Sequence, residues 1–293
     1  MLKLAAVDIG SNAIRLQLTR CSIFDGKPTF KKLEYVRFPL RLGQDVFSVG
    51  RISNESQKKF LRLMEAFKIL IDLYEVDDYM ACATSAMRDS DNGQDLVEQV
   101  KERIGLEIDV IDGETEAEII NKAIFPYMDN QTYLHIDVGG GSTELNIYVA
   151  HEKIASKSFQ LGSVRKLSDI DNSSVWNKMK SWIAGEMKPS FGKVHAIGTG
   201  GNINKVLEMA NKKPGKLISL KKVKEMQQYI ASFNMEERIN KLQLNPDRAD
   251  VIIPALDIYM NAMKLAKAPS ILVPDSGMKD GMMQMMWERN RLT

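Results

Sequence analysis

Cysteine and histidine are scarce in this chain of 293 residues, which holds two cysteines and three histidines. The cysteines, Cys21 and Cys82, are too few for a disulfide framework and lack the CxxC spacing of a redox or zinc motif. The histidines are far apart, so no His/Cys cluster indicates a zinc site. We therefore expect both thiols to be reduced packing residues.

Long apolar runs and a strong excess of charge are also missing. No run approaches the roughly 18 apolar residues that span a bilayer, and Asp8 interrupts the N-terminal MLKLAAVDIG before it can form the apolar core of a secretion signal. We expect a cytoplasmic protein without a membrane partner. The formal net charge of +2 gives no global field for nucleic acid, so no nucleic-acid partner is expected.

One local charge cluster stands out against this balance. Residues 205–224 contain seven lysines beside a single acid, Glu208. A solvated loop and helix face accounts for such a cluster.

Hydrophobic periodicity predicts an α/β protein. The segments KLAAVDIGSNAIRLQLTRC and TFKKLEYVRFPL, joined through Asp25-Gly26, predict a meander of three strands. DYMACAT and EIDVID predict two further short strands. Helices are predicted over residues 53–75, 93–104, 114–125 and 246–267, the last with a kink at Pro254.

The pattern restarts near the middle of the chain. At an offset of 129 residues, Asp137 in YLHIDVGGGSTELNIYVA matches Asp8, and Thr199 in AIGTG is taken to match Thr84 in ACATS. A repeat of this length indicates a duplicated α/β unit. We expect an N-terminal domain over residues 1–127 and a C-terminal domain over 128–293, whose last helix could pack back on the first domain. Ligands commonly bind between two such lobes, so we expect an inter-domain cleft.

Two turns, DIGSN and DVGGGST, each place an aspartate at a strand end before glycines and small hydroxyl residues. Glycines let successive backbone N–H groups cradle phosphate oxygens, and ionised aspartates suit Mg²⁺. A single hairpin of this kind is equally well a plain turn, but two in equivalent positions predict a phosphate site. The candidate phosphate-binding residues are Asp8, Gly10, Ser11, Asn12, Gly139, Gly140, Gly141, Ser142 and Thr143.

A third glycine turn, GTGGN, lies between a predicted strand and a helix whose N-terminus should attract anions. It contributes Gly198, Gly200, Gly201 and Asn202 as further phosphate-binding candidates. It lacks the GxxxxGK[ST] spacing, so a Walker-type site is not indicated.

Eight motifs run in order along the chain: AAVDIGSNAIRL, ATSAMRDS, IDGETEAEI, IDVGGGSTEL, QLGSVRK, AIGTGGNI, DRADVIIPAL and PDSGMKDGM. In this order and spacing, from residue 5 to about residue 283, the chain resembles the exopolyphosphatase/guanosine pentaphosphate phosphohydrolase family. The resemblance implies two ribonuclease H-like domains of the actin-like ATPase, sugar kinase and chaperone superfamily. It also implies Mg²⁺ as cofactor, a homodimer, and a short form without the helical domain that larger members add.

The same resemblance assigns roles to individual residues. Glu116 matches the glutamate that orients or deprotonates the attacking water, although Thr115 replaces the first glutamate of the family's G-x-E-E-A helix start and Glu114 could be a shifted substitute. Arg88 matches an arginine that reaches phosphate. The implied catalytic residues are Glu116, Asp137 and Arg88, the implied metal ligands are Asp8, Asp137 and Glu116, and Arg165 with Gly162 and Ser163 could bind phosphate.

Each role has a structural alternative. An acid in a first helical turn is stabilised by the helix dipole without any catalytic task, and most arginines form surface ion pairs.

The first expectation is therefore a Mg²⁺-dependent exopolyphosphatase, and residues 205–224 could then guide a polyanion. A guanosine pentaphosphate 5′-phosphohydrolase is the close alternative, because the motifs do not separate the two. A small-molecule kinase of the same superfamily, or a non-catalytic phosphate-binding or filament-forming protein, also remains open.

Overall fold

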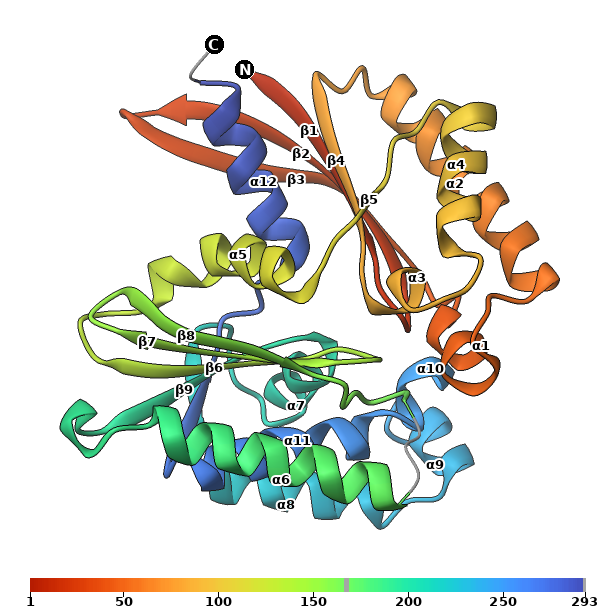
Figure 1. Ribbon diagram of the computed structural model, residues 1–293. Coiled ribbons are helices and arrows are strands. Elements are labelled where there is room, and N and C mark those ends of the chain that lie inside the picture. The colour runs from red at the N-terminus through yellow and green to blue at the C-terminus, as the bar shows by residue number, and fades with distance from the viewer. Residues whose placement is uncertain (166–168, 292–293) are drawn as a thin grey trace. The chain divides into compact units, whose positions relative to one another are not determined.

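The computed structural model describes residues 1–165 and 169–291 (Figure 1). The chain divides into two compact units, and each is described by itself. Unit 1 comprises Met1–Ala123 together with the C-terminal residues from Met278, and unit 2 comprises Ile124–Gly277.

Unit 1 is built on a five-stranded sheet in the order β3-β2-β1-β4-β5. Its strands are β1 (Leu2–Ile9), β2 (Ile14–Phe24), β3 (Lys27–Phe38), β4 (Asp78–Ala83) and β5 (Asp109–Val110). Its helices are α1 (Leu42–Val49), α2 (Asn54–Leu73), α3 (Ser85–Arg88), α4 (Gly93–Ile104), α5 (Gly113–Ile124) and α12 (Met278–Arg289). The predicted three-strand meander is confirmed, because β1, β2 and β3 pair antiparallel in succession.

Helices cover both faces of this sheet (Figure 1). On one face, Phe60 and Phe67 of α2 pack with Leu96 of α4 against Val7 and other apolar strand residues. Since side chains alternate along a strand, the neighbouring Leu4 and Ala6 point to the other face, where α12 packs on β1. Gly281 lets α12 approach α5 closely, because a Cβ there would lie 1.8 Å from the carbonyl oxygen of Ile119.

Unit 2 contains a six-stranded sheet in the order β10-β11-β9-β6-β7-β8. Its strands are β6 (Thr132–Val138), β7 (Thr143–Val149), β8 (Glu152–Phe159), β9 (Val194–Thr199), β10 (Lys216–Ser219) and β11 (Ser270–Val273). Its helices are η1 (Phe125–Tyr127), α6 (Asp169–Glu186), η2 (Pro189–Phe191), α7 (Gly201–Met209), α8 (Leu220–Ala231), α9 (Met235–Asn240), α10 (Pro246–Ala249) and α11 (Ile252–Leu265).

The core of unit 2 lies on one face of its sheet. Leu134 and Ile136 of β6 and Leu145 of β7 pack there with residues of α6, α7, α8 and α11, of which α11 supplies the largest share. The alternate residues of the same strands, which include Asp137 and Glu144, point to the opposite face. That face carries the polar side chains of unit 2 described below.

The structure corrects three of the sequence predictions. The single helix expected over residues 246–267 is two helices, α10 and α11, and Pro254 sits in the first turn of α11, where its missing amide N–H breaks no intrahelical hydrogen bond. The strand expected at EIDVID is limited to β5, Asp109–Val110. Thr199 pairs with Asp137 whereas Cys82 pairs with Asp8, so Thr199 corresponds to Cys82 and lies two positions away from the predicted match with Thr84.

Candidate active site

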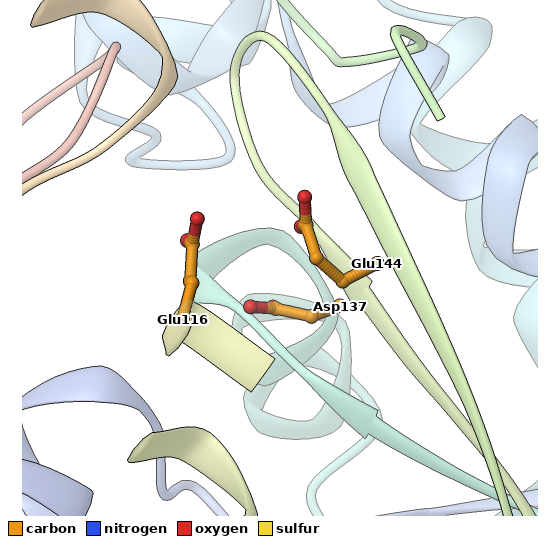
Figure 2. A group of neighbouring side chains, drawn as sticks. All are labelled: Glu116, Asp137 and Glu144. Carbon is orange, nitrogen blue, oxygen red and sulfur yellow. The ribbon is translucent and has the colours of Figure 1, made fainter. Parts of the chain in front are cut away.

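Two carboxylates lie opposite each other beside the turn of the hairpin formed by β6 and β7. Asp137 and Glu144 are paired residues in the antiparallel register, and a carboxylate oxygen of each lies within 4.8 Å of the other (Figure 2). Glu144 is only 2% exposed, and its Oε1 accepts a hydrogen bond from Ser158 Oγ of β8 at 2.9 Å. Asp137 is half-buried beside the glycine turn.

This carboxylate pair fits the requirements of a hard divalent cation. Burying two like charges at close range is costly unless a cation compensates them. Mg²⁺ prefers carboxylate oxygens, usually one or two from the protein, with substrate phosphates and waters completing its shell. Asp137 and Glu144 together therefore offer a donor set suited to Mg²⁺.

The DVGGGST turn next to this pair is held by the segment that follows β8. Val164 N and Arg165 N donate to the carbonyl oxygen of Gly140 at 2.8 and 3.0 Å, and Ser163 N donates to that of Gly139 at 3.0 Å. The side chain of Arg165 adds a hydrogen bond from Nε to the Gly141 carbonyl at 2.7 Å.

Two predicted phosphate-binding hydroxyls also contribute to this backbone scaffold. Thr143 Oγ1 donates to the carbonyl of Leu161, and Ser163 Oγ donates to that of Gly139. The predicted residues Ser163 and Arg165 are thus brought to the Gly139–Thr143 turn, where their recorded bonds shape the backbone.

The matching hairpin of unit 1 has a different charge arrangement. Asp8 and Arg15 are paired in the register of β1 and β2, and Arg15 Nη1 donates to Asp8 Oδ2 at 2.7 Å. At the same offset of 129 residues, Arg15 occupies the position that Glu144 occupies in unit 2. The charge of Asp8 is therefore balanced within its own hairpin by Arg15.

The glycine turn of unit 1 is closed in the same way as that of unit 2. Gly10 N donates to Ala13 O at 3.2 Å, as Gly139 N donates to Ser142 O at 3.0 Å. The hydroxyls of Ser11 and Ser85 are 2.8 Å apart, so Ser11 is joined to the start of α3. Asn12 is half-buried at the same turn.

The GTGGN turn follows β9 and begins α7. Gly200 adopts φ +109°, a conformation that side-chain-bearing residues rarely reach, and the half-buried Asn202 is the second residue of α7.

A chain of hydrogen bonds that begins at the exposed Ser156 and continues through buried residues fixes Thr199 at this turn. Ser156 Oγ donates to Asn146 Oδ1, the amide of Asn146 donates to His135 Nδ1, and His135 Nε2 lies 2.9 Å from Thr199 Oγ1. Burial lowers the pKa of His135 to about 3, so the imidazole is neutral. Because Nδ1 accepts from the Asn146 amide, the one ring proton is assigned to Nε2.

Arg88 and Glu116, the two candidates of unit 1 with catalytic roles, are linked through the start of α5. Arg88 Nη1 donates to the carbonyl of Ile111 at 2.8 Å. Asp112 then caps the helix, since its carboxylate accepts from Thr115 N at 2.8 Å and its carbonyl accepts from Glu116 N at 3.0 Å. Glu116 projects half-buried from the first turn of α5 and is also drawn in Figure 2.

Sequence reasoning did not single out Glu144, although the signal was present. The internal alignment that matched Asp137 to Asp8 also matches Glu144 to Arg15, an exchange of charge sign at one position of the repeat. The two turns therefore differ in charge, because a basic residue pairs with Asp8 and an acidic residue pairs with Asp137.

The hairpin with an aspartate and a glycine turn, present once in each unit at a strand end of its sheet, defines a duplicated α/β protein. A family model described as the Ppx/GppA phosphatase family matches residues 22–290. The chain belongs to this family, which confirms the resemblance found in the sequence.

Relatives carry different activities in their names. The chain is 29% identical to the bifunctional 3-dehydroquinate synthase/phosphatase of Fusobacterium nucleatum over 85% of this chain and 41% of the relative. It is 28% identical to exopolyphosphatase 1 of Mycobacterium tuberculosis (56% and 47%). It is 23% identical to the guanosine-5'-triphosphate,3'-diphosphate pyrophosphatase of Photobacterium profundum (98% and 60%). The chain thus spans between 41% and 60% of the length of these curated relatives.

Solved structures establish the fold. The exopolyphosphatase from Cytophaga hutchinsonii superposes with a TM-score of 0.82 at 24% identity, covering 98% of each chain. Ppx/GppA neighbours of this kind have the two-domain actin-like ATPase fold, which confirms the predicted fold class. Within the described ranges 1–165 and 169–291, no helix is long and apolar enough to cross a membrane.

Proposed function

We propose that this protein is a metal-dependent exopolyphosphatase, which hydrolyses the terminal phosphoanhydride bond of inorganic polyphosphate. The observation that carries the proposal is the close pair of Asp137 and Glu144 at the foot of a glycine turn. Membership of the Ppx/GppA phosphatase family supports the same chemistry. We further propose that the protein is a cytoplasmic homodimer, of which the dimer is what the family resemblance implies.

In the proposed reaction, a water molecule attacks the terminal phosphorus. Glu116 orients this water and accepts its proton, the water oxygen bonds to phosphorus, and the bond to the bridging oxygen breaks. The products are orthophosphate and a chain shorter by one phosphate. Hydrolysis of this type needs an in-line water and charge neutralisation more than a covalent nucleophile, so one positioned carboxylate suffices.

Arg88 and the glycine turns hold the phosphate chain in this proposal. Arg88 donates through Nη1 to the Ile111 carbonyl, and its Nε lies 3.4 Å from Asp89 Oδ1 in an ion pair. The planar guanidinium carries further N–H donors for phosphate oxygens. The backbone of residues 139–143 and 198–202 supplies additional N–H groups at strand ends.

The cation is assigned to the unit 2 hairpin. Asp137 and Glu144 would hold Mg²⁺, with Glu116 as a further carboxylate of the set. When bound, Mg²⁺ neutralises phosphate charge and so favours attack on phosphorus. Asp8, already balanced by Arg15, is assigned to orienting that arginine in its turn.

A parallel assay of phosphate release tests the proposal. Polyphosphate, guanosine pentaphosphate and ATP are each incubated with the protein and Mg²⁺, with and without small hydroxyl acceptors. Release from polyphosphate as the fastest reaction supports it. Preference for guanosine pentaphosphate would replace it with the nucleotide phosphohydrolase named for one relative, transfer from ATP to an acceptor would indicate a kinase, and saturable binding without release would indicate a phosphate-binding protein.

A further inference from the structure

The strands β6 and β9 separate at the point where the two glycine turns of unit 2 begin. Their parallel pairing runs from Thr132 and Val194 to Asp137 and Thr199. Beyond it, Val138 pairs with Thr143 of β7 on one side, and the backbone turns away at Gly200 with φ +109° on the other. The Val138 N–H and the Thr199 carbonyl therefore need partners outside the ladder, because buried backbone groups are costly when unpaired.

The hydroxyl of Tyr259 serves both groups. Val138 N donates to Tyr259 Oη at 3.4 Å, and Tyr259 Oη donates to the carbonyl of Thr199. One hydroxyl, acting as acceptor and donor, thus takes the place of a backbone hydrogen bond between the diverging strands. Tyr259 is 0% exposed and is carried by α11, a helix packed into the core of unit 2.

The glycines around this hydroxyl leave it just enough room. A Cβ at Gly200 would lie 3.0 Å from Tyr259 Oη and 3.3 Å from both Asp137 Oδ1 and the Val138 carbonyl. A Cβ at Gly198 would lie 3.4 Å from the tyrosine ring. Tyr259, Gly200 and Asp137 therefore form one packed contact, in which the tyrosine sets how closely the two turns approach.

Unit 1 closes the corresponding position without a side chain. There the parallel pairing of β1 with β4 continues one residue further, to Ile9 and Ala83, and a backbone hydrogen bond from Thr84 N to the carbonyl of Ile9 at 3.1 Å follows it. The tyrosine thus replaces a backbone contact in the unit that carries the carboxylate pair.

We propose that Tyr259 is a positioning residue that sets the spacing between the Asp137–Thr143 turn and the Gly198–Asn202 turn, and through it the geometry with which unit 2 binds a divalent cation and phosphate. The nature of the ligand rests on the proposed function, whereas the bracing of the two turns does not. A displacement of about 1 Å in such a site is enough to disturb binding and reaction geometry.

The test compares Tyr259→Phe with a matched control, Tyr148→Phe. Tyr148 is also 0% exposed in unit 2, and among the described residues its hydroxyl has no hydrogen-bond partner. Each variant loses one buried hydroxyl oxygen, but only Tyr259→Phe loses the two bonds at the strand ends. Ile230→Val, a fully buried change in α8, controls for lowered stability of unit 2.

Two readouts are measured, amide hydrogen exchange and direct binding. For Tyr259→Phe we expect exchange in residues 138–143 to be about tenfold faster, and Mg²⁺ and inorganic tripolyphosphate to bind about tenfold more weakly by calorimetry. Tyr148→Phe should match the wild type in both.

The proposal is overturned if Tyr259→Phe behaves like Tyr148→Phe, or if Ile230→Val accelerates the same amides as much at equal loss of stability. If the wild-type protein hydrolyses no phosphoanhydride, the proposed function is wrong. Faster amide exchange in residues 138–143 that is confined to Tyr259→Phe would still support the role of Tyr259 in setting the spacing of the two turns.

Discussion

A methyl group added at Gly162 should disrupt the Gly139–Thr143 turn of unit 2 without altering any side chain of the candidate site. The Cβ of Gly162→Ala would lie 2.3 Å from the Gly140 carbonyl oxygen and 2.4 Å from its carbon. Because ordinary carbon contacts are well above 3 Å, the segment after β8 must move by about 1 Å. That movement strains the hydrogen bonds from Val164 N and Arg165 N to the same carbonyl, which are 2.8 and 3.0 Å long.

We expect Gly162→Ala to lower the free energy of unfolding by about 1–3 kcal/mol, as overpacked sites do. The displaced turn should lower kcat/KM for phosphate release by about 100-fold. The control is Gly185→Ala in α6, where a Cβ meets nothing within 4 Å, and alanine should stabilise the helix by about 0.5–1 kcal/mol with unchanged activity. Thermal unfolding and phosphate release measure both effects. Wild-type activity in Gly162→Ala would refute the view that the carbonyl of Gly140 is a fixed part of the site.

Three further predictions follow from charges. Glu144→Gln should raise the Mg²⁺ concentration for half-maximal phosphate release at least about tenfold, whereas Glu152→Gln, at an exposed position, should not. The same Mg²⁺ dependence in both variants would show that Glu144 does not bind the cation. The lysines of residues 205–224 that are exposed can be replaced with glutamine: Lys212, Lys213, Lys216, Lys221 and Lys224. This replacement should weaken the binding of long-chain polyphosphate more than the binding of tripolyphosphate, and equal losses of binding would contradict a guiding role. Burial opposes the charge of Asp78, but hydrogen bonds from Arg289 and Asn290 hold its pKa below the usual value, so the stability it contributes is present above about pH 4 and is lost as pH falls below it. Relative to Asp78→Asn, the wild type should therefore lose about 1 kcal/mol of unfolding free energy below that pH. The loss is small because Arg289 is half exposed. The same pH dependence of the unfolding free energy in both proteins would refute this prediction.

Local sequence patterns foretold the parts of the fold that depend on neighbouring residues. The Asp25-Gly26 hairpin formed as expected because both residues adopt positive φ, 49° and 72°, as its turn type requires. The helix ending at Gly105 also formed as expected, since that glycine adopts φ 70°. The duplicated hairpin was visible because both turns need an aspartate and glycines at the same spacing.

Features that depend on distant residues were not visible. Nothing near Tyr259 in the sequence indicates that its hydroxyl reaches Val138 and Thr199, which lie 121 and 60 residues away. The pairing of Thr199 with Asp137 likewise depends on strand register. Comparison of the two sequence segments matched Thr199 to Thr84, two positions away from Cys82, its counterpart in the strand register. Helix propensity also did not separate α10 from α11, because tertiary packing decides where such helices break.

The most direct test of the account is the turnover of Glu116→Gln beside that of Glu118→Gln, which changes an exposed glutamate on the same helix. Phosphate release from polyphosphate is measured at saturating substrate and Mg²⁺, together with calorimetric binding of tripolyphosphate. Glu116→Gln should bind like the wild type and turn over at least about 100-fold more slowly, the scale of losing a general base, while Glu118→Gln should be unaffected. Near-wild-type turnover in Glu116→Gln would contradict the claim that this carboxylate activates the attacking water.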